Sequence, residues 1–268
     1  MRVRHASLVT LILLSATATG LEGQRRADQA RLMFSLGMGW ATGGGTLWSV
    51  GRQPLAVQLN EIDTLSVSRS FRNNLNVVFS GTYFPGNSLG FTVEAQLLGL
   101  GTVDACAIRQ TLGATYTQEA CSSISGSERS SSSTALAGGV MYRIASHNVI
   151  HPYLRAMGGM VIVQESFLKM KGRVTGSTGE KADLILYEDD GGTSLSPYVG
   201  LGGGVVIATG RGFQMRFEVR DNWVNVPGVS GPTSRQGIVP PSDRVGVHRL
   251  TATIGFDILL ERKRGRRY

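Results

Sequence analysis

No apolar run near the length of a membrane-spanning helix occurs in the sequence after its first two dozen residues. A helix needs about 20 predominantly apolar residues to cross the hydrocarbon core of a bilayer, so a helical span is excluded for that part of the chain. Mean hydropathy is +0.01. That value suits either a soluble protein or a β-barrel whose strands are apolar on one face only.

Cysteines and compact basic patches are scarce as well. Cys106 and Cys121 are the only 2 cysteines, and without nearby histidine they make a poor set of metal ligands, so the sequence predicts neither a metal nor a cofactor site. In an oxidising compartment we expect them to form a disulfide within one long loop. The formal net charge is +8, but no Lys/Arg patch with interleaved aromatics accounts for it, which excludes nucleic acid as an expected partner.

The N-terminus has the order of a secretory signal peptide. A basic start, RVRH, precedes the apolar stretch 6–18, and small residues offer a cleavage site after Ala18 or after Gly23. The apolar stretch is too short to span a membrane comfortably. The predicted organisation is a signal peptide over 1–23, a barrel domain over 24–260 and a basic periplasmic tail over 261–268.

Eight amphipathic strand candidates follow, joined alternately by short and long connections. The strands are predicted at roughly 32–41, 74–84, 89–101, 135–145, 151–164, 196–208, 212–223 and 248–260. The short connections are 85–88, 146–150 and 209–211, and the long ones, predicted as polar loops without helices, are roughly 42–73, 102–134, 165–195 and 224–247. Such long connections are unusual in a compact soluble domain. The pattern is typical of an all-β fold, an eight-stranded antiparallel up-and-down transmembrane β-barrel with short periplasmic turns and long extracellular loops.

Period-2 alternation gives each predicted strand one apolar face and one polar face. In 213–220, which reads FQMRFEVR, every second residue is apolar. The polar faces carry charges of both signs, which suit a small filled lumen in which the charges pair, because an unpaired buried charge is costly. The predicted lumen charges are Glu94, Arg143, Arg155, Arg216, Glu218, Arg220 and Asp257. In the alternative arrangement these faces are solvated and the apolar faces enclose a ligand, as in a secreted lipocalin-like barrel.

Aromatic residues near the strand ends favour the membrane arrangement. In outer-membrane barrels, two aromatic girdles mark the two membrane interfaces. The belt predicted at the short-turn ends comprises Tyr83, Phe84, Tyr142, Tyr153, Tyr198 and Phe213. The belt predicted at the long-loop ends comprises Trp40, Phe167 and Trp223.

The strand pattern resembles that of the small eight-stranded outer-membrane β-barrels of Gram-negative bacteria, the group that includes the OmpA transmembrane domain and the OmpX- and OmpW-like proteins. The segment 253–260, TIGFDILL, also resembles the barrel-assembly signal of such proteins, with Ile258 and Leu260 in place of the usual aromatics. The resemblance implies a location in the cell outer membrane, reached through a cleaved signal peptide.

One histidine is a candidate for catalysis. His248 opens the last predicted strand at the long-loop rim, with Ser234, Ser242 and Asp243 nearby in the sequence. Some of the small outer-membrane barrels that this chain resembles modify lipid A with a serine, a histidine and an acid at that rim. A catalytic triad is defined by geometry, so His248 is kept as a candidate and no catalytic residue is assigned.

An eight-stranded lumen is filled by side chains, so a diffusion pore is not expected. We expect a structural or surface-interaction role in the outer membrane: membrane integrity, adhesion, or binding through the extracellular loops. A lipid A-modifying hydrolase or acyltransferase is the alternative, and a secreted ligand-binding barrel is the second. The expected partners of this monomer are outer-membrane lipid and lipopolysaccharide, the barrel-assembly machinery and an extracellular ligand.

Overall fold

The fold is described from a computed structural model. It describes residues 32–58, 61–86, 88–110, 114–129, 131–146, 148–165, 170–175, 179–188, 192–210, 212–227, 233–234 and 243–260. The predicted signal peptide and the predicted basic tail therefore lie outside the described residues.

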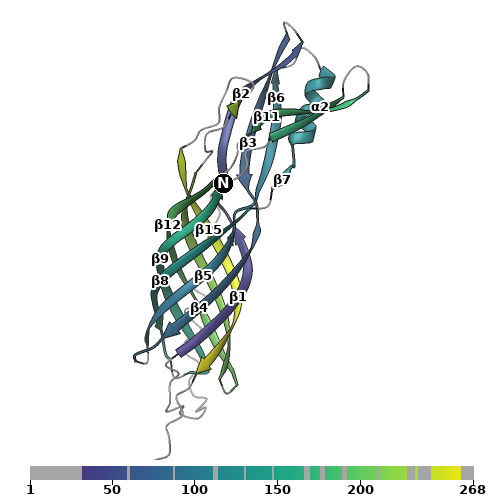
Figure 1. The fold of residues 1–268 in the computed structure, drawn as a ribbon. Coiled ribbons are helices and arrows are strands. Elements are labelled where there is room, and N and C mark those ends of the chain that lie inside the picture. Colours follow the sequence, from purple (N-terminus) through teal and green to yellow (C-terminus); the bar gives the residue numbers. More distant parts are fainter. Residues whose placement is uncertain are drawn as a thin grey trace, which may run out of the picture.

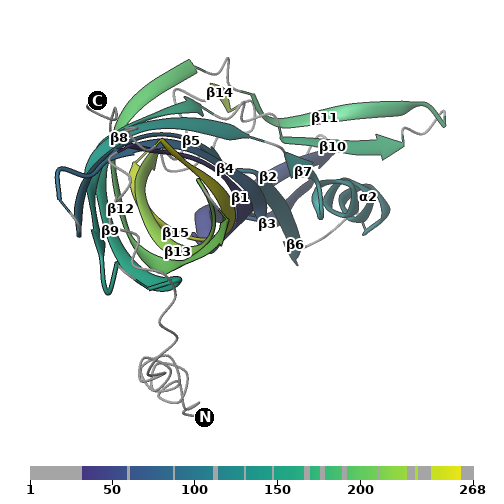
Figure 2. The ribbon, with the colours of Figure 1, turned by 90° about the horizontal axis from the view of Figure 1, so that it is seen from below.

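Eight antiparallel strands close into a barrel (Figures 1 and 2). They are β1 (Leu32–Thr42), β4 (Asn74–Tyr83), β5 (Leu89–Gly99), β8 (Ser132–Arg143), β9 (Ile150–Glu165), β12 (Gly192–Gly210), β13 (Phe213–Pro227) and β15 (Arg244–Leu260). The order around the wall, β1-β15-β13-β12-β9-β8-β5-β4, is that of the sequence. The ring closes where β1 pairs with β15, from Leu32 opposite Leu260 to Thr42 opposite Leu250. This confirms the predicted eight-stranded up-and-down barrel.

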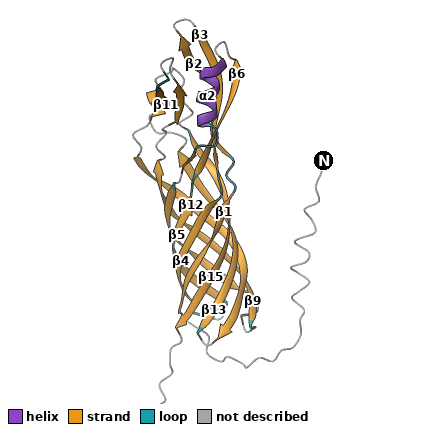
Figure 3. Cartoon of the chain, turned by 90° about the vertical axis from the view of Figure 1, so that its right-hand side faces the viewer, coloured by secondary structure: helices purple, strands orange, loops and turns teal. Residues whose placement is uncertain are grey.

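The prediction that the long connections are loops without helices is wrong. They contain β2 (Thr46–Gln58), β3 (Glu61–Phe71), β6 (Thr102–Gln110), α2 (Ala114–Ile124), β7 (Glu128–Arg129), β10 (Met170–Thr175), β11 (Lys181–Glu188) and β14 (Thr233–Ser234). Together these elements form what we call the head, with one sheet ordered β2-β3-β6-β7 and a second ordered β10-β11-β14. The head stands beyond the long-loop end of the barrel (Figures 1 and 3).

The helix in the head was hidden by its composition. Its buried side chains are Thr117, Ala120, Cys121 and Ile124, which have the i, i+3, i+4, i+7 spacing of a helix face. Three of the four are small or weakly apolar, so the spacing gave little signal among many serines. Small residues also let α2 approach β10 closely: a Cβ added at Gly172 would lie 3.3 Å from the Cβ of Ala120.

One apolar core joins the head to the upper barrel. In the head it contains Trp48, Leu55, Leu65, Val67, Ile124, Val174, Leu186 and Tyr187. It continues into the barrel through Ala41, Leu98, Ala135, Val161, Tyr198, Val224 and Val247. Buried Val224, Val226 and Val247 explain why β13 and β15 run four residues past their predicted ends (227 − 223 and 248 − 244): these strands extend into the core of the head.

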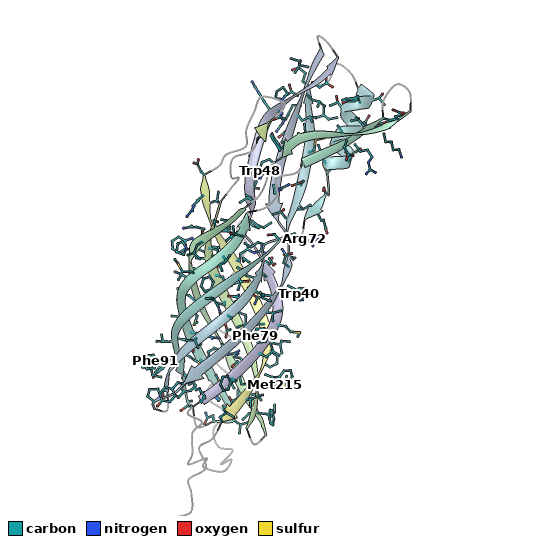
Figure 4. All side chains as sticks on the ribbon, viewed as in Figure 1. Trp40, Trp48, Arg72, Phe79, Phe91 and Met215 are labelled. Carbon is teal, nitrogen blue, oxygen red and sulfur yellow. A yellow bond between two sulfur atoms is a disulfide. The ribbon has the colours of Figure 1, made fainter. Side chains whose placement is uncertain are left out.

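The barrel wall is apolar on the outside. On β15, Leu250, Ile254, Phe256, Ile258 and Leu260 are about half exposed, while the alternate residues Thr251, Asp257 and Leu259 are buried. Side chains such as Trp40, Phe79 and Phe91 project outward from the wall (Figure 4). This is the face distribution of an outer-membrane barrel and the reverse of a lipocalin-like one, so the alternative of a secreted ligand-binding barrel is wrong. No helix in the described part of the chain is long and apolar enough to cross a membrane.

Candidate functional site: lumen, rim and head

The centre of the lumen is a network of buried charges from three strands. Glu94 on β5 forms an ion pair with Arg155 on β9, with Nη2 and Oε2 2.7 Å apart. Arg220 on β13 pairs with both Glu94 and Glu218. The Tyr153 hydroxyl donates to Glu218 Oε2 at 2.6 Å. Each carboxylate thus has more than one partner, which offsets the cost of its burial.

The network continues toward the short-turn end. Arg216 lies 3.9 Å from a Glu218 oxygen and 3.6 Å from an Asp257 oxygen. Arg143 is placed separately, with its guanidinium stacked 3.5 Å from the centroid of the Phe84 ring and Nη2 3.6 Å from the sulfur of Met33. All seven predicted lumen charges therefore lie inside the barrel, six of them in one connected network.

Above the charges lies a neutral polar layer that sequence reasoning missed. The Tyr198 hydroxyl lies 2.8 Å from Gln96 Oε1 and 2.7 Å from Asn222 Oδ1. Gln96 donates to Asn76 at 2.8 Å, and Asn222 donates to the Thr251 hydroxyl at 3.0 Å. The available signal was that each of these amides occupies an inward position of its strand.

The junction between lumen and head is occupied by Arg249, which is fully buried. Its guanidinium donates to the backbone carbonyls of Gly43, Ala41, Arg72 and Gly99. The Ala41 and Gly43 carbonyls lie where the chain leaves β1 for the head, and the Gly99 carbonyl lies where it leaves β5 for the head. The Arg72 carbonyl lies where the chain returns from β3 to the barrel. One side chain of the last strand therefore holds three crossings between barrel and head.

The head has polar contacts of its own inside its core. Arg69 on β3 and Asp104 on β6 form a buried two-pronged ion pair, with N–O distances of 2.6 and 2.8 Å, and Arg69 lies over the Trp48 ring. The Tyr187 hydroxyl donates to Gln53 at 2.6 Å, and burial raises the pKa of this hydroxyl, so it remains a donor. The Tyr187–Gln53 bond links the two sheets of the head, and the Arg69–Asp104 pair joins β3 to β6 within one of them.

The predicted disulfide is present. Cys106 and Cys121 are bonded, across a sequence separation of 15. The bond joins β6 to α2, so it holds the helix on the sheet.

The predicted aromatic belts are partly wrong. Tyr83, Tyr142 and Phe213 at the short-turn end, and Trp40 and Trp223 at the long-loop end, face outward and are about half exposed or more. Phe84, Tyr153 and Tyr198 are almost fully buried and point into the lumen, where Phe84 stacks on Arg143 and the tyrosine hydroxyls reach polar partners. Tyr198 also lies nearer the long-loop end, and Phe167 lies outside the described residues.

The structure places His248 beside an acid. His248 Nδ1 lies 2.9 Å from Asp221 Oδ2, and the imidazole stacks on Trp223 with ring centroids 5.7 Å apart. The His248 imidazole and the Asp221 carboxylate are both exposed on the outer wall at the rim. Ser242 lies outside the described residues, as does the side chain of Ser234. Within the described ranges, no group of three His, Cys, Asp or Glu residues is placed to hold a metal ion.

Comparison with known proteins returned structures only. No protein-family model matches the sequence, and no curated protein matches it. The chain is similar to the structure of Neisserial surface protein A, with TM-score 0.41, 11% identity, 86% of this chain and 98% of that chain. For outer membrane protein AlkL the TM-score is 0.43 and the identity 11%, and the match covers 91% of this chain and 97% of that chain. For the N-terminal barrel of Pseudomonas aeruginosa OprF the TM-score is 0.38 and the identity 9%, and the match covers 86% of this chain and 98% of that chain.

Proposed function

We propose that this protein is an outer-membrane barrel that displays a folded head outside the cell and acts through that head in surface interaction. The observation that carries the proposal is the head itself: it has a buried Arg69–Asp104 pair, a disulfide and an apolar core continuous with the barrel. A connection that served only to join two strands would need none of these features. Binding sites are commonly placed on segments that a rigid scaffold holds in position.

The proposed membrane location is supported by the height of the apolar band. Phe213 and Trp223, in the two outward belts of β13, are 10 residues apart (223 − 213). At about 3.3 Å per residue and a strand tilt of about 40°, this separation corresponds to roughly 25 Å along the membrane normal. That is the height of the apolar band of outer-membrane barrels.

The proposed partners follow from the same placement. Outer-membrane lipid and lipopolysaccharide would surround the wall, and the barrel-assembly machinery would recognise β15. We propose that the lumen is closed by its paired charges and does not conduct, and that the protein is a monomer. We propose that the ligand of the head is an extracellular molecule.

Location and orientation are tested by labelling intact cells. Ser49→Cys places a thiol on the exposed face of the head, and Asn148→Cys places one in a short turn of the barrel. A membrane-impermeant maleimide should label the first variant on intact cells and the second only after lysis. Recovery of the protein in the detergent-free soluble fraction, or labelling of Asn148→Cys on intact cells, would contradict the proposal.

The role of the head is tested in cells that lack the protein. They are complemented with the wild type or with Arg69→Met, which loosens the head and leaves the barrel strands unchanged. Adhesion to wells coated with extracellular-matrix protein should be restored by the wild type alone, while resistance to detergent should be the same for both. If the wild type and Arg69→Met both restore detergent resistance and neither changes adhesion, the role is membrane integrity.

A second candidate function is favoured by the His248–Asp221 contact. A carboxylate on Nδ1 orients an imidazole so that its Nε2 accepts a proton, as in hydrolytic triads. At the rim this pair would face the ester and phosphate groups of outer-leaflet lipid, which suits a lipid A-modifying hydrolase. Lipid A profiles from cells with the wild type and with His248→Gln separate the two functions, because identical profiles remove the enzyme hypothesis.

A further inference from the structure

A groove crosses the outer wall of the barrel over β15, β1, β4, β5 and β8. Its volume is about 910 Å³. Large apolar side chains project outward around it, namely Phe34, Leu36, Phe79, Leu136, Phe256 and Ile258, and Val93 stands between Gly81 and Gly138. Phe79 is seen on this wall in Figure 4.

The floor of the groove consists of small residues. Gly81, Ala95 and Gly138 occupy outward positions on three neighbouring strands. The space above Gly138 is empty of protein: a Cβ added there would have only the Thr92 carbonyl oxygen within 4 Å, at 3.9 Å. A Cβ added at Gly81 would meet the Phe34 ring at an ordinary contact distance of 3.7 Å.

Two exposed tyrosines lie below this floor on the same wall. Tyr83 follows Gly81 by two residues on β4, and Tyr142 follows Gly138 by four residues on β8. They flank β5, because Tyr83 pairs with Phe91 and Tyr142 pairs with Leu89. Both side chains are about half exposed, and tyrosines at this level lie among lipid headgroups. The wall therefore presents an apolar trough that ends at a pair of hydroxyl groups.

We propose that this groove binds one phospholipid of the periplasmic leaflet, with an acyl chain in the trough and the headgroup at Tyr83 and Tyr142. The proposal rests on the proposed membrane location. At about 3.3 Å per residue, the floor lies roughly 5 to 10 Å above the tyrosines along the tilted strands, within the hydrocarbon of that leaflet. Glu94 also lines the groove, but its carboxylate is already buried in the lumen with Arg155 and Arg220, so an apolar chain in the trough buries no further charge.

A second copy of the barrel fits the groove less well. A two-fold interface would bring the same wall of both copies together. The hollow of one copy would then face the hollow of the other and leave a void, and atoms that line a void lose their dispersion contacts. A flexible acyl chain follows the trough instead.

The test is native mass spectrometry of the detergent-solubilised full chain, titrated with phosphatidylglycerol. The wild type should show one saturable adduct. Gly81→Leu combined with Gly138→Leu fills the trough and should weaken that adduct by about tenfold or more. The matched control is Ala252→Leu, which also adds a leucine to the outward face but lies outside the groove, and it should bind like the wild type.

The headgroup contact has its own readout. Tyr83→Phe combined with Tyr142→Phe keeps the trough and removes both hydroxyls, so phosphatidylglycerol should fall to the affinity of diacylglycerol, which lacks the phosphate. Equal binding by the wild type and the filled variant, or a dimer of the wild type that the filled variant abolishes, would overturn the proposal. Heat-dependent gel migration of every variant reports whether the barrel is folded, and cell fractionation reports whether it is in the membrane, so failure of the membrane assignment is distinguishable from failure of this site.

Discussion

The guanidinium of Arg249 lies 5.5 Å from the centroid of the Phe71 ring, although the two residues are 178 positions apart in the sequence (249 − 71). Phe71 is the last residue of β3 in the head, and Arg249 is an inward residue of the last barrel strand. The contact closes the top of the lumen and supports the base of the head at the same point. The head is thus attached through a buried cation as well as through the chain.

Replacing Arg249 should loosen the head while the barrel stays closed. Arg249→Met fills similar volume but removes the guanidinium's hydrogen bonds to the carbonyls of Ala41 and Gly99, whereas the Arg72 carbonyl still accepts from the amide of Asn74. Each unsatisfied buried carbonyl costs about 1–3 kcal/mol, so the free energy of head opening should fall by several kcal/mol. Faster amide hydrogen exchange in β2 and β3, with unchanged exchange in the barrel part of β13 (213–222), is the expected result. Arg244→Met, at an exposed position of the same strand, is the control and should change neither.

The Arg69–Asp104 pair should matter far more than its surface counterpart. Asp104→Asn leaves a buried guanidinium without its carboxylate, and breaking a buried pair costs about 3–5 kcal/mol. Arg72 and Glu128 form an ion pair with 30% and 60% of the two side chains exposed, so Glu128→Gln should cost at most about 1 kcal/mol. Unfolding of the head is followed through the fluorescence of Trp48, which lies next to Arg69. Equal destabilisation by the two variants would contradict the assignment.

Reduction of the Cys106–Cys121 bond should release α2 from the sheet. On the loop-entropy account a bond across this separation contributes about 3 kcal/mol. Protease cleavage within 111–125 should therefore accelerate after treatment with a reductant, and the Cys106→Ser, Cys121→Ser double variant should show the same rate without it. Migration of the barrel on a gel should be unaffected in both cases. An unchanged cleavage rate would show that packing alone holds the helix.

Arg220 should be the most sensitive residue of the lumen, because its guanidinium donates two hydrogen bonds to each of the Glu94 and Glu218 carboxylates. Arg220→Met leaves Glu94 and Glu218 with Arg155 as their one shared cation, and the loss of the buried pairs should cost about 3–5 kcal/mol. Adding Glu94→Gln removes the repulsion and should recover part of that loss. Urea unfolding of the barrel in lipid vesicles measures both variants. If the second substitution adds to the damage, the two residues do not interact as the structure places them.

The sequence predicted the barrel well because alternation is a local signal. In β13, FQMRFEVR shows which residues face lipid and which face the lumen before any contact is known. The head was missed because its elements depend on distant partners: β2 and β3 pair with each other through an irregular register, and α2 buries small residues that carry little hydropathy. Polar, serine-rich composition was mistaken for the absence of structure.

The belt errors have a different origin: closeness to a strand end predicts a belt position, but Tyr153 and Tyr198 occupy inward positions of the alternating pattern and are buried. A tyrosine at an inward position must find a partner for its hydroxyl, and Tyr153 finds Glu218. Tyr153→Phe should therefore cost about 1.5–3 kcal/mol of barrel stability, the value of a hydrogen bond to a charged group. Tyr142→Phe removes an outward hydroxyl near the same end of the barrel. It should cost less than about 1 kcal/mol, because that hydroxyl contacts lipid or water and its removal leaves no buried group unpaired. Urea unfolding in vesicles compares the two, and equal costs would show that parity does not distinguish lumen from belt.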